Sequence, residues 1–217
     1  MTPEQIAKHF LRALVAAAAP SEPYRHWLLC EALPREASHG IAALPFAPPA
    51  IGDTLGKRET HNSTRVFFSP ENQRDHAVCA AVVEAFQSKA VTDALQERTG
   101  SDLSGSFLRI EYCQDTDGFW LEPHTDIGAK LFTMLVYLSD RPEAAGWGTD
   151  IYAAAGRHLG AVDGSFNRGL IFIPGRDTWH GVKKRDFAGV RKSIIVNFVK
   201  PEWRSRHELA FSDTPVG

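Results

Sequence analysis

The 217-residue sequence predicts an α+β fold that is mainly β, in which N-terminal helices cover an antiparallel sandwich or jelly roll. The first observation is a change at Gly100, where alanine-rich helical periodicity gives way to short aromatic and β-branched runs. The second is that seven or eight such runs follow, separated by Gly, Pro and Asp at the spacing of an all-β core. No repeat or linker divides the chain, so we expect one domain over 1–217, with helical support in 1–100, the jelly-roll core in 101–200 and a C-terminal tail in 201–217.

The N-terminal hundred residues predict several helices and one short strand. Thr2, Pro3 and Gln5 are placed as a capping box with proline in the first turn, so a helix is expected over 3–19. Its apolar stripe of Ile6, Phe10 and Leu14 is typical of a helix that packs on the body of the fold. The other expected elements are an extended segment or short helix over 24–33, a helix over 34–43, a loop over 44–60, a strand over 66–68 and helical segments from 69 to 95.

The C-terminal half predicts the strands of the core. The segment 130–138 is apolar on both faces, so we expect a central strand with helices on one side and the barrel interior on the other. The N-terminal helices are then expected on the outer face of the sheet. The predicted strands cover 106–113, 119–126, 130–138, 149–153, 169–173, 179–183 and 191–199.

Composition limits the classes of partner. Hydrophobic residues make up 43% of the chain, charged residues 23%, and the net charge is −2, with no basic stripe that would indicate nucleic acid. Cys30, Cys79 and Cys113 are odd in number and lie among apolar neighbours, which predicts buried free thiols in a reducing compartment. The apolar run 13–19 is too short for a membrane span and favours a helix over a signal peptide. We therefore expect a cytoplasmic protein with no membrane or nucleic-acid partner.

Two side chains at the end of a predicted strand have the types and spacing of metal ligands. His124 and Asp126 are two residues apart, so in an extended strand they project to the same face. The third ligand is expected at His180, which follows the Pro174-Gly175 turn and begins another strand. Two histidines and one carboxylate bind a divalent first-row metal and leave coordination positions open for chemistry.

An arginine heads the last predicted strand. Alternation along 191–199 puts Arg191, Ser193 and Asn197 on one face. An arginine in an apolar strand is costly to bury without an anion, and its planar fork can hold a carboxylate with help from a neighbouring hydroxyl. The alternative is an ordinary ion pair at the strand end with an acidic residue such as Asp186.

His124-x-Asp126, His180 and Arg191-x-Ser193, in this order and spacing, resemble the Fe(II)- and 2-oxoglutarate-dependent dioxygenases, particularly the prolyl-4-hydroxylase-like branch. The resemblance covers 108–199, about 90 residues, and almost none of the first hundred. Two departures place the chain in the wider branch. Prolyl hydroxylases often have a lysine where Arg191 stands, and 146–149 replaces the paired glycines that commonly precede an acidic residue.

The resemblance implies a double-stranded β-helix core of the jelly-roll, cupin-like type. It implies that the protein couples oxidative decarboxylation of 2-oxoglutarate to succinate and CO2 with hydroxylation of a C–H bond. Fe(II), 2-oxoglutarate and O2 would be required, with ascorbate as reductant. The site residues implied are His124, Asp126 and His180 for iron and catalysis, Arg191 for the distal carboxylate of 2-oxoglutarate, Ser193 or Tyr137 as supporting donors, and Tyr112 lining the cosubstrate pocket.

The substrate is open between a small molecule and a peptidyl residue. Asn62, Arg65 and Trp179 are candidates for contacting it, and the loop 44–65 is a candidate lid. Arg65 is otherwise a solvated surface charge, and Trp179 otherwise packs in the β core. Two alternative functions use the same residues: a zinc-dependent hydrolase, since zinc also takes such ligands, and a non-catalytic cupin-like binding module.

Overall fold

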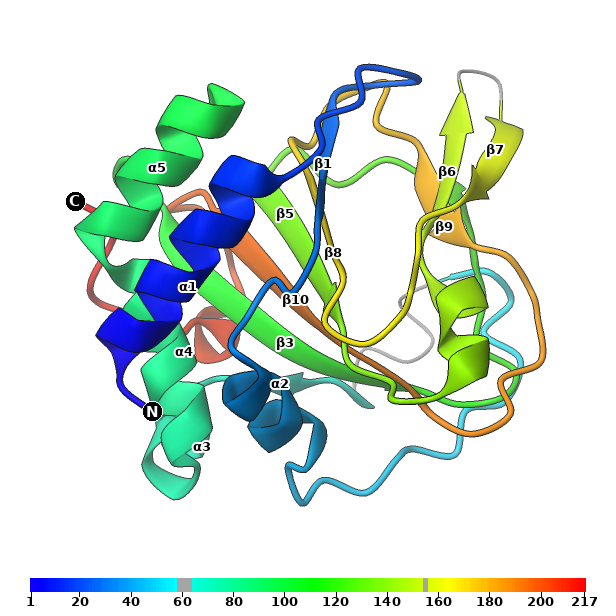
Figure 1. Ribbon diagram of the computed structural model, residues 1–217, viewed down its shortest axis with the longest axis horizontal. Helices are drawn as coiled ribbons and strands as arrows, with labels where there is room; N and C mark the ends of the chain where they lie inside the picture. Colours follow the sequence, from blue (N-terminus) through cyan, green and yellow to red (C-terminus); the bar gives the residue numbers. More distant parts are fainter. Residues whose placement is uncertain (58–63, 154–155) are drawn as a thin grey trace.

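The computed structural model describes residues 1–57, 64–153 and 156–217, and it shows two antiparallel sheets with helices packed on the larger one (Figure 1). The larger sheet has the strand order β1-β8-β5-β10-β3-β2, and the smaller sheet has the order β4-β9-β6-β7. The predicted α+β, jelly-roll architecture with helices on the outer sheet is confirmed, although helix and strand contribute similar shares of the chain. The strands are β1 (His26–Leu29), β2 (Val66–Phe67), β3 (Phe107–Asp115), β4 (Leu121–His124), β5 (Lys130–Tyr137), β6 (Asp150–Ala153), β7 (Arg157–Ala161), β8 (Gly169–Phe172), β9 (His180–Val182) and β10 (Arg191–Val199).

The helices α1, α4 and α5 lie together on the side of the large sheet that faces away from β6, β7 and β9 (Figure 1). The helical segments expected from 69 to 95 are three helices, with N-caps at Ser69, His76 and Ser88. The helical elements are α1 (Pro3–Ala16), α2 (Arg35–Ala42), α3 (Pro70–Asp75), α4 (Ala77–Gln87), α5 (Lys89–Thr99) and the 3-10 helices η2 (Pro142–Trp147) and η4 (Arg206–Glu208).

Helix α1 begins as predicted and ends earlier. Thr2 and Gln5 form the expected capping box, and the apolar stripe is buried, with the rings of Phe10 and Phe86 4.8 Å apart. The helix stops at Ala16 rather than 19 because the backbone carbonyl of Ala18 accepts a hydrogen bond from Leu28, which extends this segment along β1.

Strand β5 is central, as the sequence predicts. It lies between β8 and β10, so both of its edges are hydrogen-bonded. Phe132, Met134 and Val136 join the main hydrophobic cluster under the helices, while Leu135 and Tyr137 belong to a second cluster on the other face of the strand. This second face looks toward the smaller sheet and forms the floor of the candidate site.

Two further expectations concern membrane-spanning helices and the burial of the cysteines. None of the helices within the described ranges is long and apolar enough to cross a membrane. Cys79 and Cys113 are buried as predicted, but Cys30 is exposed, because it follows the last residue of the short strand β1. All three cysteines are free thiols.

Candidate functional site

The three predicted metal ligands converge between the two sheets. His124 is the last residue of β4 and pairs in register with His180, the first residue of β9. Asp126 lies in the segment after β4. The strand is predicted to reach residue 126 but ends at His124. One ligand atom from each of the three side chains lies within 4.8 Å of the others. Pairing of β4 with β9 therefore brings together residues that are 54 and 56 positions apart in the sequence.

Backbone hydrogen bonds orient both imidazoles. The Nδ1 atom of His124 donates to the carbonyl of Glu122 at 2.9 Å, and the Nδ1 atom of His180 donates to the carbonyl of Thr178, also at 2.9 Å. A carbonyl oxygen only accepts, so Nδ1 carries a proton in each ring and Nε2 is the nitrogen available to a metal ion. Both histidines are thus held in the tautomer that a metal ion requires from Nε2.

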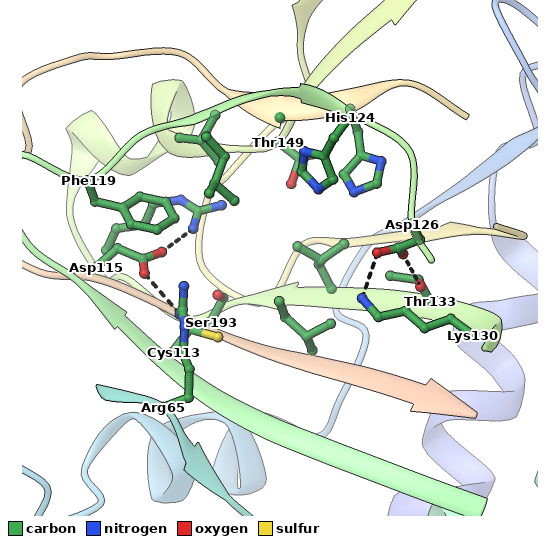
Figure 2. A pocket seen from close by; sticks show the side chains of 17 residues that line it. Arg65, Cys113, Asp115, Phe119, His124, Asp126, Lys130, Thr133, Thr149 and Ser193 are labelled. Atoms are coloured by element: carbon green, nitrogen blue, oxygen red, sulfur yellow. Dashed lines mark hydrogen bonds and ion pairs between the residues drawn. The ribbon is translucent and has the colours of Figure 1, made fainter. Parts of the chain in front are cut away.

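The protonation states of the other groups also suit a metal ion. Burial lowers the pKa of His180 to about 4, which keeps this imidazole neutral at physiological pH. Burial alone would raise the pKa of Asp126, but the charge of Lys130, together with His180 and hydrogen bonds, holds it well below its usual range. The Oδ1 atom of Asp126 accepts from Lys130 Nζ at 2.6 Å, and Oδ2 accepts from Thr133 Oγ1 at 2.8 Å (Figure 2).

A chain of hydrogen bonds continues from Asp126 across the large sheet. Thr133 on β5 accepts from the side-chain amide of Asn197 on β10 at 2.9 Å. The Asn197 carbonyl accepts from Arg109 on β3 at 3.3 Å, and Arg109 donates through Nε to Glu208 at 2.5 Å. The candidate metal ligand is therefore connected to η4 at the C-terminal end of the chain, which is a packed segment rather than a loose tail.

The triad opens into a cavity, here called the central cavity, with His124 and Asp126 at one end and Asp115 at the other (Figure 2). His180 lines the same cavity beside His124, with the ring centroids 4.4 Å apart, and Arg191 lines it beside Asp115. Arg191 donates through Nε to the carbonyl of Trp147 at 2.6 Å and through Nη1 to Asp115 at 2.6 Å. Its ion-pair partner is therefore Asp115, and no ion pair with Asp186 is formed.

Two buried donors at this end of the cavity have no partner among the described residues. They are Nη2 of Arg191 and Oγ of Ser193, and both side chains line the cavity. Alternation along β10 places them on one face, as the sequence predicts, while Ile194 and Val196 face the helices. A buried donor left without an acceptor is costly, so this end of the cavity suits an acceptor-rich ligand.

Tyr137 lies behind Arg191. Its hydroxyl donates to Thr149 Oγ1 at 2.8 Å and accepts from the Thr149 backbone at 3.1 Å. Its ring centroid is 5.8 Å from Cζ of Arg191. Thr149 lines the cavity and Tyr137 does not, so the tyrosine contacts the arginine and holds the threonine.

The placement predicted for Tyr112 is wrong. Tyr112 pairs with Ile194, and both side chains lie in the main hydrophobic cluster on the helix side of the sheet. Its hydroxyl lies 3.5 Å from the carbonyl of Ala42. Because neighbouring side chains on a strand point to opposite faces, Cys113 and Asp115 line the cavity in its place.

The three candidate substrate residues have different outcomes. Asn62 lies outside the described residues. Arg65 is not a solvated charge: its side chain is 6% exposed, lines the central cavity and pairs with Asp115 at 2.9 Å. Trp179 is half-buried, and it lines neither of the two cavities that border the triad within the described chain, so the structure gives it no place in the site.

The described part of the candidate lid packs beside the triad. The carbonyl of Gly56 accepts from the backbone of Glu122 at 3.0 Å, and Trp120 donates through Nε1 to Asp53 at 2.6 Å. Gly56 has a φ of +72°, and a Cβ there would lie 2.7 Å from the Trp120 ring, so this position requires glycine. Lid movement stays a prediction.

No model of a known protein family matches the sequence, and no curated protein matches it either. Solved structures do. A prolyl-4-hydroxylase from Pseudomonas putida aligns with a TM-score of 0.58 at 15% identity, covering 92% of this chain and 98% of that one. A Trichoplax adhaerens prolyl hydroxylase in complex with a peptide fragment of hypoxia inducible factor aligns at 0.55 and 15%, covering 91% and 90%. A prolyl 4-hydroxylase from Phytophthora capsici aligns at 0.60 and 11%, covering 91% and 65%. The chain therefore shares the jelly-roll fold of the prolyl hydroxylases.

Proposed function

We propose that the protein is an Fe(II)- and 2-oxoglutarate-dependent oxygenase that hydroxylates a C–H bond of a peptide or small molecule. The observation that carries this proposal is one cavity with a His-Asp-His triad at one end and two unpartnered buried donors, on Arg191 and Ser193, at the other. A zinc hydrolase gives these two donors no role, and the intact triad argues against a non-catalytic binding module.

The triad fits a ferrous ion. His124 and His180 present Nε2 from fixed rings, and Asp126 supplies a carboxylate that stays ionised. Two imidazoles and one carboxylate leave open positions for a cosubstrate and O2. Lys130 and Thr133 hold the carboxylate and so orient it toward the ion.

The far end of the cavity fits the distal carboxylate of 2-oxoglutarate. Arg191 Nη2 and Ser193 Oγ would each donate one hydrogen bond to it, and a charge-assisted bond from arginine is among the stronger ones available. Tyr137 supports this role through its ring, which lies against Arg191, and through its bond to Thr149.

When bound, Fe(II) with 2-oxoglutarate and O2 supplies the oxidising power, and succinate, CO2 and a hydroxylated product result. The chain's own part is to position the cosubstrate and to exclude water. Leu135, Val182 and Ile195 form part of the apolar wall of the cavity. Such a wall favours reaction over loss to solvent.

Several features belong to the same proposal. Residues 1–217 act as one catalytic unit, since the main hydrophobic cluster joins α1 to β10. Ascorbate serves as reductant, as in the enzymes that the sequence motifs resemble. The location is cytoplasmic, which the three free cysteines support. A peptide substrate is supported by the bound peptide fragment in the Trichoplax adhaerens neighbour.

The decisive experiment is anaerobic addition of Fe(II) and 2-oxoglutarate to the folded protein. A visible metal-to-ligand charge-transfer band is expected, and folded protein without this band would contradict the proposal. Arg191→Ala is expected to weaken 2-oxoglutarate binding and spare metal binding, whereas Asp126→Ala abolishes hydroxylation. Tyr112→Phe is a matched control, because Tyr112 lies on the opposite face of the sheet. Succinate release stimulated by peptide and compound pools would then identify the substrate.

A further inference from the structure

Asp115 lies between two arginines at the far end of the central cavity (Figure 2). Its Oδ2 atom is 2.6 Å from Nη1 of Arg191, and its Oδ1 atom is 2.9 Å from Nη1 of Arg65. The two cations come from distant parts of the chain, one from the head of β10 and the other from the residue before β2. The carboxylate is 1% exposed, and both guanidinium side chains are nearly as buried.

The charges at this end do not cancel. Among the described side chains at this end, Arg65 and Arg191 contribute two positive charges and Asp115 one negative charge, which leaves a net charge of about +1 for these three residues. The next acidic side chain on the inner face of β3, Glu111, is held by Arg109 at 3.1 Å. Burial alone lowers the pKa of Arg65, but the charge of Asp115, together with smaller contributions from its neighbours, more than offsets this effect and raises the pKa above its usual value, so the guanidinium stays charged.

This surplus charge matters because Asp115 competes with any anion for Arg191. Asp115 already takes Nη1 of Arg191, and the Trp147 carbonyl takes Nε, which leaves Nη2. A carboxylate bound at Nη2 and Ser193 lies beside the carboxylate of Asp115, and two like charges at such a distance repel strongly in a buried site. Arg65 pairs with the Oδ1 atom of Asp115, and its positive charge offsets that repulsion.

We propose that Arg65 is a positioning residue for 2-oxoglutarate: by neutralising Asp115 it keeps the Arg191 end of the cavity attractive to the distal carboxylate. This inference rests on the proposed function and extends it to a residue outside the motifs. A net charge of +1 is matched by one incoming carboxylate, so the occupied cavity end is neutral. Without Arg65, the same carboxylate would make this end a buried net negative charge.

Four variants test this role of Arg65. Arg65→Met removes the cation and keeps much of the side-chain volume, and Arg65→Lys keeps the charge. Asp115→Asn removes the competing anion. The double variant Arg65→Met/Asp115→Asn restores the net charge of +1 without either original partner.

The measurement is isothermal titration of 2-oxoglutarate into Mn(II)-loaded protein, which reports binding without turnover. Arg65→Met is expected to weaken binding about 10- to 100-fold, as removal of one charge a few ångströms away in a buried site implies. Arg65→Lys and the double variant should stay within about threefold of the unchanged protein, and Asp115→Asn should bind at least as tightly. Pyruvate, which lacks the distal carboxylate, should bind all five proteins alike.

Three results would overturn the inference. They are an Arg65→Met variant that binds 2-oxoglutarate normally, a double variant that binds no better than Arg65→Met, or an equal loss of pyruvate binding, which would indicate distortion of the cavity. If Arg65→Met does not fold, the other variants still test the inference. The double variant must then bind 2-oxoglutarate within about threefold of the unchanged protein, and Asp115→Asn must bind it at least as tightly. An unchanged protein that binds no 2-oxoglutarate would instead refute the proposed function itself.

Discussion

Thr133 has a single hydroxyl that serves two partners. It donates to the Oδ2 atom of Asp126 and accepts from the side-chain amide of Asn197. This is the arrangement of a residue that orients a metal ligand, because the donated bond fixes the rotation of the carboxylate. Thr133 was not singled out by its sequence context, since a threonine within an apolar strand is ordinary.

Thr133→Val should weaken metal binding about 10- to 100-fold, the usual cost of losing a hydrogen bond that orients a metal ligand. Valine keeps the shape of threonine, so the fold is retained while Asp126 and Asn197 each lose a partner. Titration of Mn(II) or Fe(II) under anaerobic conditions measures the effect. Thr133→Ser is the control and should bind metal nearly normally, whereas equal loss in both variants would point to packing rather than to the hydroxyl.

At the level of elements, the sequence predicts most of what local pattern controls. The alternation of β10 correctly separates Arg191 and Ser193 from the helix-facing residues, and the candidate metal triad is recognised from residue type and spacing. The sequence does not predict strand β7, because the residues of this strand are mostly exposed and do not alternate between apolar and polar. Strand ends are set by pairing with a neighbour, which explains why β4 ends before Asp126.

The side of the sheet on which Tyr112 lies could have been predicted from the sequence of β3. Along β3 the polar residues Arg109, Glu111 and Asp115 occupy alternate positions, while Ile110 and Tyr112 fall between them. In a strand covered by helices on one face, the apolar set faces the helices. This alternation directs Tyr112 toward the helices and Asp115 into the cavity. The partnership of Asp115 with Arg65 is different, because it joins segments whose proximity depends on the whole sheet order.

Helix α1 carries a stability prediction of its own. Phe10 is fully buried and its ring packs against Phe86 on α4, so Phe10→Ala should cost about 3–5 kcal/mol of unfolding free energy through lost burial and a residual cavity. Denaturant unfolding monitored by circular dichroism measures this cost. Val15 on the same helix is 80% exposed, and Val15→Ala should change stability by less than about 0.5 kcal/mol. A similar loss in both variants would mean that the buried stripe stabilises the fold no more than the exposed face does, and would contradict the docking of α1.

At the level of the whole molecule, the proposed ligands connect the two sheets. His124 and His180 belong to the smaller sheet through β4 and β9, whereas Arg191 and Ser193 belong to the larger sheet through β10. A metal ion held by one sheet and a cosubstrate anchored to the other would form a bridge across the cavity. Ligands that bind only the folded state stabilise it by mass action.

We therefore expect Mn(II) and 2-oxoglutarate together to raise the melting temperature more than either alone. At about 100 times its dissociation constant, a ligand adds about 2.7 kcal/mol, which for a chain of this size corresponds to a shift of about 5–10 °C. Scanning calorimetry or thermal-shift fluorescence measures it.

His180→Ala and Arg191→Ala separate the two halves of this bridge. His180→Ala should lose the shift from Mn(II), and with it most of the shift from 2-oxoglutarate, because the keto acid would then lack its metal anchor. Arg191→Ala should keep the Mn(II) shift and lose only the increment from 2-oxoglutarate, because β10 no longer holds the distal carboxylate. An undiminished increment in the Arg191 variant would place the cosubstrate elsewhere and would break the proposed link between the sheets.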